Sequence, residues 1–373
     1  MAQILFRTLG NDYPKRVFAN VIEKEAYTPL YLLEGPLGVG KATLAHEVVA
    51  AALCESEEIR PCRECTNCKR VFSFSHPDFM VLLPKEYEER LDKERNRREE
   101  DREYTLRFYG RPHIRPDDFS WQSKITIDQV RAIGEEAKKP PFEAKHRFIV
   151  ILDGDLMDPM KPEAQNAFLR TLEEGGGGRT TFLMVSSSPK LILPTILSRA
   201  RRVRFFTLSL EDFSRYPFGG EIPIPVLHRL SEGSIGMAKR FLGPQSQLLR
   251  KSAAAVLLGD REAIADVISF IGRDRSLAET FLTVYSSLLR DARVMKTGAG
   301  ELIINLDMRD TVERLAKNLT DSQIEELFRG ARVAEEAILE RYISPETALL
   351  AGFKGLFPPS FRDTVKWSAF GRS

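Results

Sequence analysis

Hydrophobic and polar positions follow different patterns in the two parts of this chain. Up to about residue 207, short continuous apolar runs of the kind that form buried parallel strands alternate with segments of helical period. From Leu208 onward only helical periods remain. The pattern therefore predicts an α/β region followed by an all-helical region. The apolar runs occupy residues 30–33, 79–83, 146–153 and 181–185, and an apolar and basic run follows Arg199.

The first of these runs leads into a Gly-rich turn with a phosphate-binding signature. Gly35, Gly40 and Lys41 fit the spacing G-x-x-x-x-G-K, with a strand before them and an Ala-rich helix after them. Gly38 lies inside the turn. The backbone N–H groups of such a loop, the start of the helix and the lysine ammonium together cradle phosphates. The sequence therefore predicts a phosphate loop built from these four residues.

Two groups that a phosphate-loop ATPase uses for chemistry are missing. The residue after the loop lysine, whose hydroxyl holds Mg²⁺, is Ala42. Thr43 carries a hydroxyl, but one step along a helix is a rotation of about 100°, which aims it away from the metal. In such an ATPase another strand ends in an Asp followed by a Glu that polarises the attacking water, and here the run 146–153 ends in Asp153 followed by Gly154. A register shifted to Asp155 does not supply that Glu either, because Leu156 follows. We therefore expect weak or absent ATP binding and no hydrolysis.

The four cysteines of the chain lie close together in the sequence. Cys54, Cys62, Cys65 and Cys68 have the spacing C-x7-C-x2-C-x2-C. In a reducing compartment such a cluster indicates a metal site before disulfides. Four thiolates match the number and softness of ligands that Zn²⁺ prefers, and four protein ligands leave no open position for catalysis. We expect one structural zinc ion, with His76 either as a substitute ligand or as the cap of a nearby turn.

Length, charge and hydropathy limit the remaining possibilities. A chain of 373 residues suits two or three domains. Its formal net charge of +2 does not indicate a general nucleic-acid binder. No apolar run approaches the ~20 residues that span a bilayer, and the N-terminal residues lack the pattern of a signal peptide. We expect a cytoplasmic protein that does not enter a membrane.

A long charged segment interrupts the α/β pattern. Residues 85–103 are nearly all charged, with both signs and no apolar period, and residues 104–122 read as the return of an insertion. We expect a solvated helix or a disordered loop over 85–122, with partner binding as the lesser alternative.

A basic segment, LPTILSRARRVR, spans residues 193–204 and places a helical turn before the last strand. The turn carries Ser198 and Arg199. An arginine in this position is either ordinary surface charge or a finger that reaches a phosphate across an interface. The spacing leaves both interpretations open.

The order of these motifs resembles one protein family. The phosphate loop, the four-cysteine module, HPDF, ITIDQVRAI, QNAFLRTLEE and LPTILSRARRVRF follow one another as in the bacterial DNA polymerase III clamp-loader subunits of the AAA+ class, over roughly residues 9–242. The resemblance implies a RecA-like AAA+ phosphate-loop domain, a small helical lid domain and an all-α collar domain. On this basis we expect domains at 1–207, 208–243 and 244–373, with the zinc module at 54–68 inside the first.

The resemblance also separates two kinds of family member. In the ATP-hydrolysing tau/gamma subunits, a hydroxyl follows the loop lysine, a Glu follows the strand Asp, and an Arg of the small helical domain reads the γ-phosphate. This chain has Ala42, Gly154 and the pair Gly236–Met237 at the three positions. The resemblance therefore implies a catalytically degenerate subunit.

A function and a set of partners follow from the resemblance. The family's S-R-C element, which supplies an arginine finger to a neighbouring ATP site, matches Ser198-Arg199-Ala200, so Arg199 is the expected finger in trans. The implied partners are tau/gamma and delta subunits in a hetero-pentamer, the sliding clamp, and primed DNA reached through the complex. One rival is an active tau/gamma-like ATPase in which Thr43 and Asp155 replace the missing groups. Another is a zinc-dependent nucleic-acid binder, which the balanced charge of residues 55–70 disfavours.

Overall fold

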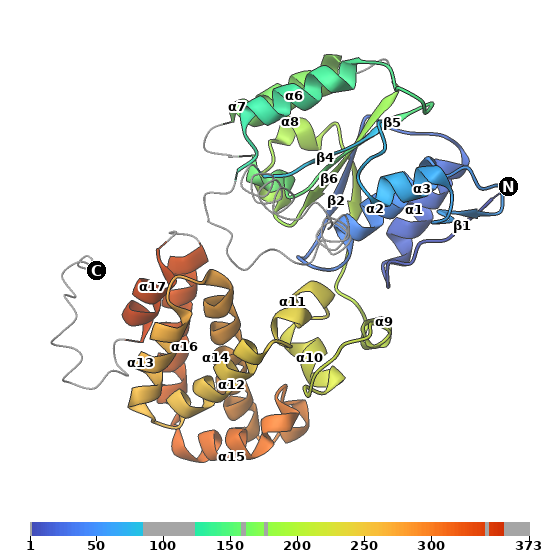
Figure 1. Cartoon of the computed structure of the whole chain (residues 1–373). Coiled ribbons are helices and arrows are strands. Elements are labelled where there is room, and N and C mark those ends of the chain that lie inside the picture. Colours follow the sequence, from blue (N-terminus) through green and yellow to red (C-terminus); the bar gives the residue numbers. More distant parts are fainter. Residues whose placement is uncertain (1, 85–123, 158–161, 175–177, 340–342, 354–373) are drawn as a thin grey trace, which may run out of the picture. The chain divides into compact units, whose positions relative to one another are not determined.

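A computed structural model of the chain describes residues 2–84, 124–157, 162–174, 178–339 and 343–353 (Figure 1). These residues divide into two compact units. The first comprises the described residues up to Tyr216 together with Ser234–Gly236. The second comprises residues 217–233 and the described residues from Met237 onward. The charged insertion expected at 85–122 lies outside the described residues.

A five-stranded parallel sheet is the centre of the first unit. Its strands are β2 (Leu30–Glu34), β4 (Phe79–Leu82), β5 (Arg147–Ile151), β6 (Thr180–Ser186) and β7 (Arg201–Arg204), and a small separate sheet pairs β1 (Gln3–Ile4) with β3 (Ile59–Arg60). The strand order of the large sheet is β4-β5-β6-β2-β7. All residues of β2, β5 and β6 are buried, as continuous apolar runs in a sheet covered on both faces should be.

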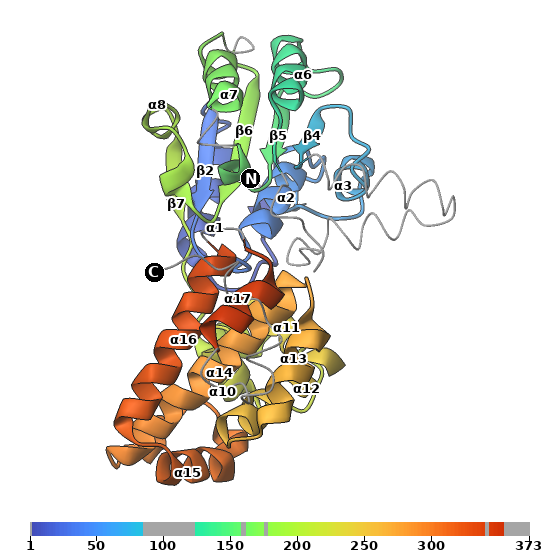
Figure 2. The ribbon, with the colours of Figure 1, turned by 90° about the vertical axis from the view of Figure 1, so that its left-hand side faces the viewer.

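Helices cover both faces of this sheet (Figure 2). They are α1 (Asp12–Glu23), α2 (Lys41–Ala52), α3 (Thr66–Phe72), α6 (Ile127–Lys138), α7 (Glu163–Glu174) and α8 (Pro194–Leu197). The short helix α9 (Leu210–Ser214) follows β7 in the chain and lies away from the sheet (Figure 1). Successive residues of β2 point to opposite layers because side chains alternate along a strand. Tyr31 and Leu33 pack with α1 and α2, whereas Leu30 and Leu32 pack with α6, α7 and α8. The phosphate loop therefore leaves the sheet from a strand anchored in both cores.

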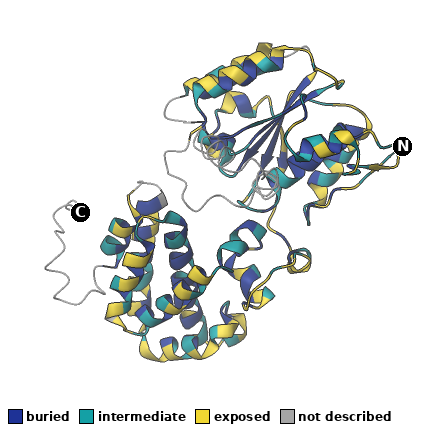
Figure 3. Cartoon of the chain, in the orientation of Figure 1, coloured by how far each residue is buried: buried dark blue, intermediate teal, exposed yellow. Residues whose placement is uncertain are grey.

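The second unit is a bundle of helices. They are α10 (Ile224–Leu230), α11 (Ile235–Arg240, whose first two residues group with the first unit), α12 (Pro244–Leu257), α13 (Arg261–Ile271), α14 (Arg275–Lys296), α15 (Arg309–Asn318), α16 (Asp321–Leu339) and α17 (Pro345–Gly352). The long helix α14 is central, since α12, α15 and α16 all pack against it. Its Phe281 and Tyr285 are buried and meet the ring of Phe353 edge-on. Figure 3 shows buried and exposed stripes along these helices, which is the amphipathic pattern of the sequence.

The order of elements confirms an α/β region followed by helices. In the described part of the chain, β7 is the last strand and ends at Arg204. The three expected domain boundaries and the lid and collar assignments stay predictions. None of the helices in the described ranges is long and apolar enough to cross a membrane.

Candidate metal centre and phosphate loop

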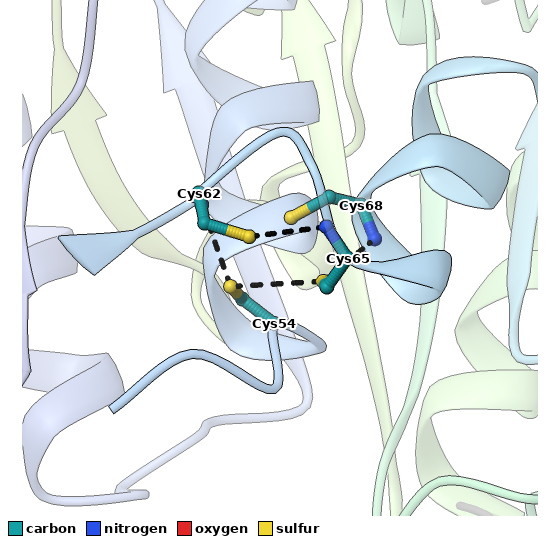
Figure 4. A group of neighbouring side chains, drawn as sticks. All are labelled: Cys54, Cys62, Cys65 and Cys68. Carbon is teal, nitrogen blue, oxygen red and sulfur yellow. Dashed lines mark hydrogen bonds between the residues drawn. The ribbon is translucent and has the colours of Figure 1, made fainter. Parts of the chain in front are cut away.

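The four cysteines converge on one point beyond the end of α2 (Figure 4). Cys54 follows this helix, Cys65 caps α3 with its sulfur, and Cys68 lies in the first turn of α3. Their Sγ atoms and that of Cys62 lie within 4.8 Å of one another. Tetrahedral Zn²⁺ with Zn–S bonds of about 2.3 Å needs sulfurs roughly 3.8 Å apart, so a small contraction would suffice. The expected cluster is therefore confirmed as a group that could hold a metal ion.

Backbone N–H groups point at these sulfurs. Cys54 Sγ accepts a hydrogen bond from Cys62 N at 3.4 Å. Cys62 Sγ accepts one from Cys65 N at 3.3 Å, and Cys65 Sγ accepts one from Cys68 N at 3.4 Å. The bond from Cys65 lowers the pKa of the Cys62 thiol to about 7, whereas burial raises the pKa of the Cys54 and Cys68 thiols. Because a cation binds the thiolate form and offsets the cost of burying it, the donor set fits a structural Zn²⁺.

His76 lies outside this cluster. Its Nδ1 accepts a hydrogen bond from Asp78 N at 3.1 Å, and its Nε2 faces Glu143 Oε1 at 3.4 Å. The metal-binding group found among the described residues contains cysteines alone. Of the two roles that the sequence left open for His76, the structure supports the turn cap.

A buried carboxylate joins the cysteine module to the helix after the phosphate loop. Glu47 of α2 is 2 % exposed and accepts a hydrogen bond from the Arg63 guanidinium at 2.5 Å. It also accepts bonds from Arg7 N and Thr8 N, each at 3.0 Å. The cysteine module, α2 and the N-terminal segment are thus fastened at one point. Sequence reasoning missed Glu47 because its partners lie 16 to 40 residues away along the chain.

The glycines of the phosphate loop are required by its backbone and by close approach. Gly35, Gly38 and Gly40 have φ values of 147°, 73° and 98°. A Cβ on Gly35 would lie 2.3 Å from Phe205 O, and one on Gly38 would lie 2.6 Å from Ser234 Oγ. A side chain at either position would therefore force its neighbour to shift and would be strained at these φ values. The three glycines therefore serve internal packing as well as any ligand.

The ammonium group of Lys41 is held by protein oxygens. Lys41 is 4 % exposed. Its Nζ donates to Gly35 O at 2.7 Å, to Pro36 O at 2.5 Å and to Ser187 Oγ at 3.1 Å. An ammonium has three N–H donors, and these contacts match that capacity. The next residue, Ala42, packs against the apolar layer and offers no oxygen to a metal.

Two further loop carbonyls bond to the segment Ser234–Gly236. Ser234 Oγ donates to Leu37 O at 2.7 Å, and Gly236 N donates to Gly38 O at 3.0 Å. Lys41 and four carbonyl groups of the loop are therefore engaged within the protein in this conformation.

The acidic residues after β5 do not rebuild a catalytic pair. Asp153 adopts a left-handed backbone with φ 51°. Asp155 is 7 % exposed and accepts a hydrogen bond from Ser187 N at 3.2 Å. Between them, Gly154 packs against β6, where an added Cβ would lie 2.5 Å from Met184 Cγ. A Glu at position 154 would therefore require Met184 to move.

Arg199 follows α8 on the surface of the first unit. Its side chain is 44 % exposed. Nη2 donates to Glu173 Oε1 at 2.7 Å, and Nη1 donates to Thr195 O at 3.0 Å. An ion pair this exposed contributes little stability, so exchanging Glu173 for another anion would cost little.

Two other arginines of the basic segment bind a buried carboxylate. Arg202 donates through Nε and Nη2 to Glu34 Oε2, at 3.0 and 2.6 Å. Arg204 Nε donates to Glu34 Oε1 at 3.1 Å. Glu34 is 4 % exposed and ends β2, so these pairs fasten β7 to the strand that carries the phosphate loop. Arg201, which is exposed and outside this cluster, is the suitable comparison for Arg199.

Several known proteins are similar to this chain. A sequence model of the family described as DNA polymerase III, delta subunit, matches residues 10–209. DNA polymerase III subunit delta' of Pseudomonas aeruginosa is 30 % identical over 268 residues, which cover 70 % of this chain and 68 % of that relative. The protein of the same name from Bacillus subtilis is 27 % identical over 200 residues. These residues cover 53 % of this chain and 49 %, about half, of the length of that relative. The solved structure of a DNA polymerase III gamma subunit-related protein from Thermotoga maritima is 12 % identical, with a TM-score of 0.41. The match covers 93 % of this chain and 98 % of that protein.

Proposed function

The chain belongs to the DNA polymerase III delta-subunit family, and from this premise we propose that it works as the delta-prime subunit of a clamp loader. The family inferred from the motif order is thereby confirmed. In the proposed assembly the chain joins tau/gamma and delta subunits in a hetero-pentamer. That complex opens a sliding clamp and loads it onto primed DNA, with energy from ATP bound by the neighbouring subunits.

The catalytic groups that are missing around the phosphate loop carry the proposal of a non-hydrolysing role. Lys41 is held by protein oxygens, Ala42 supplies no Mg²⁺ ligand, and position 154 carries Gly in place of the Glu that orients water. Catalysis of phosphoryl transfer depends almost entirely on positioning and charge stabilisation, and both are lost together. The engagement of Asp155 also weighs against the active-ATPase alternative.

Arg199 is the proposed contribution of this chain to catalysis. It stands on the surface, in a weak ion pair, where a neighbour's γ-phosphate could replace Glu173. A planar guanidinium delivered there would stabilise charge on the transferring phosphoryl group. The chain then serves a site on another subunit while its own site stays inactive.

The metal and the helical regions have supporting roles in this proposal. One Zn²⁺ on Cys54, Cys62, Cys65 and Cys68 would stabilise the cysteine module, which Glu47 fastens to α2. Residues 208–243 would form a lid-like helical domain and residues 244–373 a collar for oligomerisation.

Reconstitution tests the proposed function. ATPase and clamp-loading rates of tau/gamma and delta subunits, with clamp and primed DNA, would be measured with and without this chain. We expect loading only when the chain is present, and no ATP turnover by the chain alone. Equal loading without the chain would exclude the function. Steady turnover by the isolated chain that Lys41→Ala abolishes would instead favour an active ATPase.

A further inference from the structure

The loop that joins α6 to β5 is built around a buried carboxylate. Asp78 is fully buried. It accepts hydrogen bonds from the consecutive backbone N–H groups of Phe142, Glu143 and Ala144, at 2.6, 2.9 and 2.8 Å. Burial alone would raise the pKa of Asp78, but these bonds lower it below its usual value. The ionised carboxylate therefore fixes the backbone of three successive residues.

A buried arginine holds the other side of the same loop. Arg147 Nη1 donates to the carbonyl oxygens of Glu136 and Lys139, and Nη2 donates to Pro140 O at 3.1 Å. The same Nη2 lies 3.4 Å from Asp78 Oδ1. Burying an ion pair is costly unless hydrogen bonds replace those to water. Here the loop backbone bonds to the Asp78 carboxylate and to both terminal nitrogens of Arg147, while Arg147 Nε has no hydrogen-bond partner among the described residues. The loop is thus held in one conformation from both sides.

This loop presents an aromatic side chain to solvent. Phe142 is 82 % exposed, more than any other large hydrophobic residue in the described ranges. Single exposed hydrophobic residues are common, but the backbone beneath this one is fixed by a dedicated buried cluster. An aromatic residue held in place loses little conformational entropy on binding, and such residues carry much of the affinity of protein interfaces. These are the properties of a preformed anchor.

Phe142 and Arg199 lie at the same end of the parallel strands, the end at which the strands begin. Phe142 precedes β5 and is bonded to Asp78, which precedes β4, whereas Arg199 precedes β7, so three to four strand spacings or roughly 14–19 Å separate the two residues in the strand order. Two ion pairs lie between them, Arg199 with Glu173 and Glu174 with Lys138. A standard interface covers about 800 Å² of each partner, a patch roughly 30 Å across. One partner can therefore cover both residues.

The charge around Phe142 is balanced, which indicates the kind of partner. The neighbouring pairs are Lys138 with Glu135, Lys139 with Glu136, Lys145 with Glu25, and Arg70 with Glu143. Without a positive field, a nucleic acid or an anionic lipid surface is not favoured. We propose that Phe142 anchors the neighbouring subunit to which Arg199 is delivered, by entering an apolar pocket on that subunit. The identity of this neighbour rests on the proposed function.

Photo-crosslinking in the assembled complex tests this anchor. The full chain would carry p-benzoylphenylalanine in place of Phe142, in a complex first shown to load clamps. We expect a crosslink to the ATP-binding neighbour that position 201 also reaches. Position 206 is the matched control, because Phe206 is 63 % exposed but follows β7, at the opposite end of the strands.

The outcomes of this experiment separate the two proposals. No crosslink from position 142 in a complex that loads clamps, or a crosslink to DNA alone, would overturn the anchor and leave the proposed function standing. Failure of the unmodified chain to assemble and load would overturn both.

An affinity measurement gives the second test. Phe142→Ala should raise the chain concentration needed for half-maximal assembly by about 10- to 100-fold, as truncation of an interface hot spot does. Phe206→Ala should leave that concentration unchanged. Because Phe142 is exposed, both variants should unfold at the same temperature as the unmodified chain. Equal assembly by the two variants would show that Phe142 is not an anchor.

Discussion

Helix α2 separates two candidate ligand sites with opposite properties. At its start, the phosphate loop keeps its glycines and its lysine, yet Lys41 and two loop carbonyls are bonded to other protein groups. Beyond its end, four sulfurs face one another at distances close to those of a zinc site. The loop can keep its shape without a ligand because Gly35 and Gly38 also permit close packing. At the phosphate loop the lysine is already bonded to protein oxygens, whereas the four sulfurs face one another. Whether the ligand-binding side chains are already bonded within the protein therefore says more about a site than the shape of its motif.

Removing the metal should have the largest effect of any change to the two sites. Structural zinc contributes about 10–16 kcal/mol in zinc-finger peptides, so Cys62→Ser should destabilise the first unit by several kcal/mol and abolish zinc copurification. Cys62→His is the matched control, because it conserves a zinc ligand. Metal analysis and denaturant unfolding measure both effects. A zinc content well under one ion per chain, in protein purified without chelator, would show that the cysteine cluster holds no structural zinc. The difference between this site and the phosphate loop would then disappear.

The next largest effect is expected from Arg199→Ala. This variant tests whether a chain with an inactive phosphate loop contributes to catalysis at the ATP site of another subunit. Arginine fingers are worth about 10³ to 10⁵ in rate, but other interfaces of the ring would keep their own, so ATPase and clamp loading of the complex should fall partially. Assembly should be unchanged. Arg201→Ala is the control, since Arg202 and Arg204 bind the buried Glu34 and their loss would disturb the fold. Equal rates for the two variants would identify Arg199 as surface charge.

Acid should weaken the helix that connects the two sites. Burial lowers the pKa of His46 in α2 from 6.5 to about 4, because its ring packs against Phe74 and Phe79. The hydrogen bond between His46 Nδ1 and Ala42 O opposes this shift only in part. The unfolded chain therefore binds a proton at higher pH than the folded chain. Stability is complete above about pH 6.5 and falls by roughly 3 kcal/mol as pH drops to about 4.

The variant His46→Phe checks this sign. The difference in free energy of unfolding between variant and unmodified chain should be constant above pH 7 and should shift in favour of the variant between pH 6.5 and 4. An unchanged difference across that range would mean that His46 is not responsible for the acid sensitivity.

The smallest effect is expected from restoring the missing hydroxyl. Ala42→Thr should raise affinity for Mg²⁺–ATP by about tenfold or less, the value of one hydrogen-bonding group, because Lys41 stays engaged with the loop. Ala42→Val has the same shape without the hydroxyl and is the control. Neither variant should hydrolyse ATP, because Gly154 remains. Hydrolysis by the Thr variant but not by the Val variant would show that the loop lacks only this hydroxyl group to be an active site.

The strands, the helices and the cysteine cluster could be predicted because their signals are local. Apolar periodicity places β2 and α2, and cysteine spacing brings four sulfurs together over 15 residues of sequence. The closure of the loop could not be predicted, because Lys41 meets Ser187 at a separation of 146 residues and Leu37 meets Ser234 at a separation of 197. The same holds for the burial of Glu34, the charged residue that ends β2, because its partners follow about 170 residues later.

The position of β7 at the end of the strand order has a consequence for solubility. An edge strand leaves one side of its backbone open to pairing with a second molecule. In β7 only Val203 is buried, and the other three residues are exposed arginines. Two copies of this edge would bring like charges together, so edge-to-edge aggregation is opposed. The arginines that bind Glu34 thus also keep the protein from polymerising through its own sheet, and replacing them with β-branched residues should make it prone to form fibres.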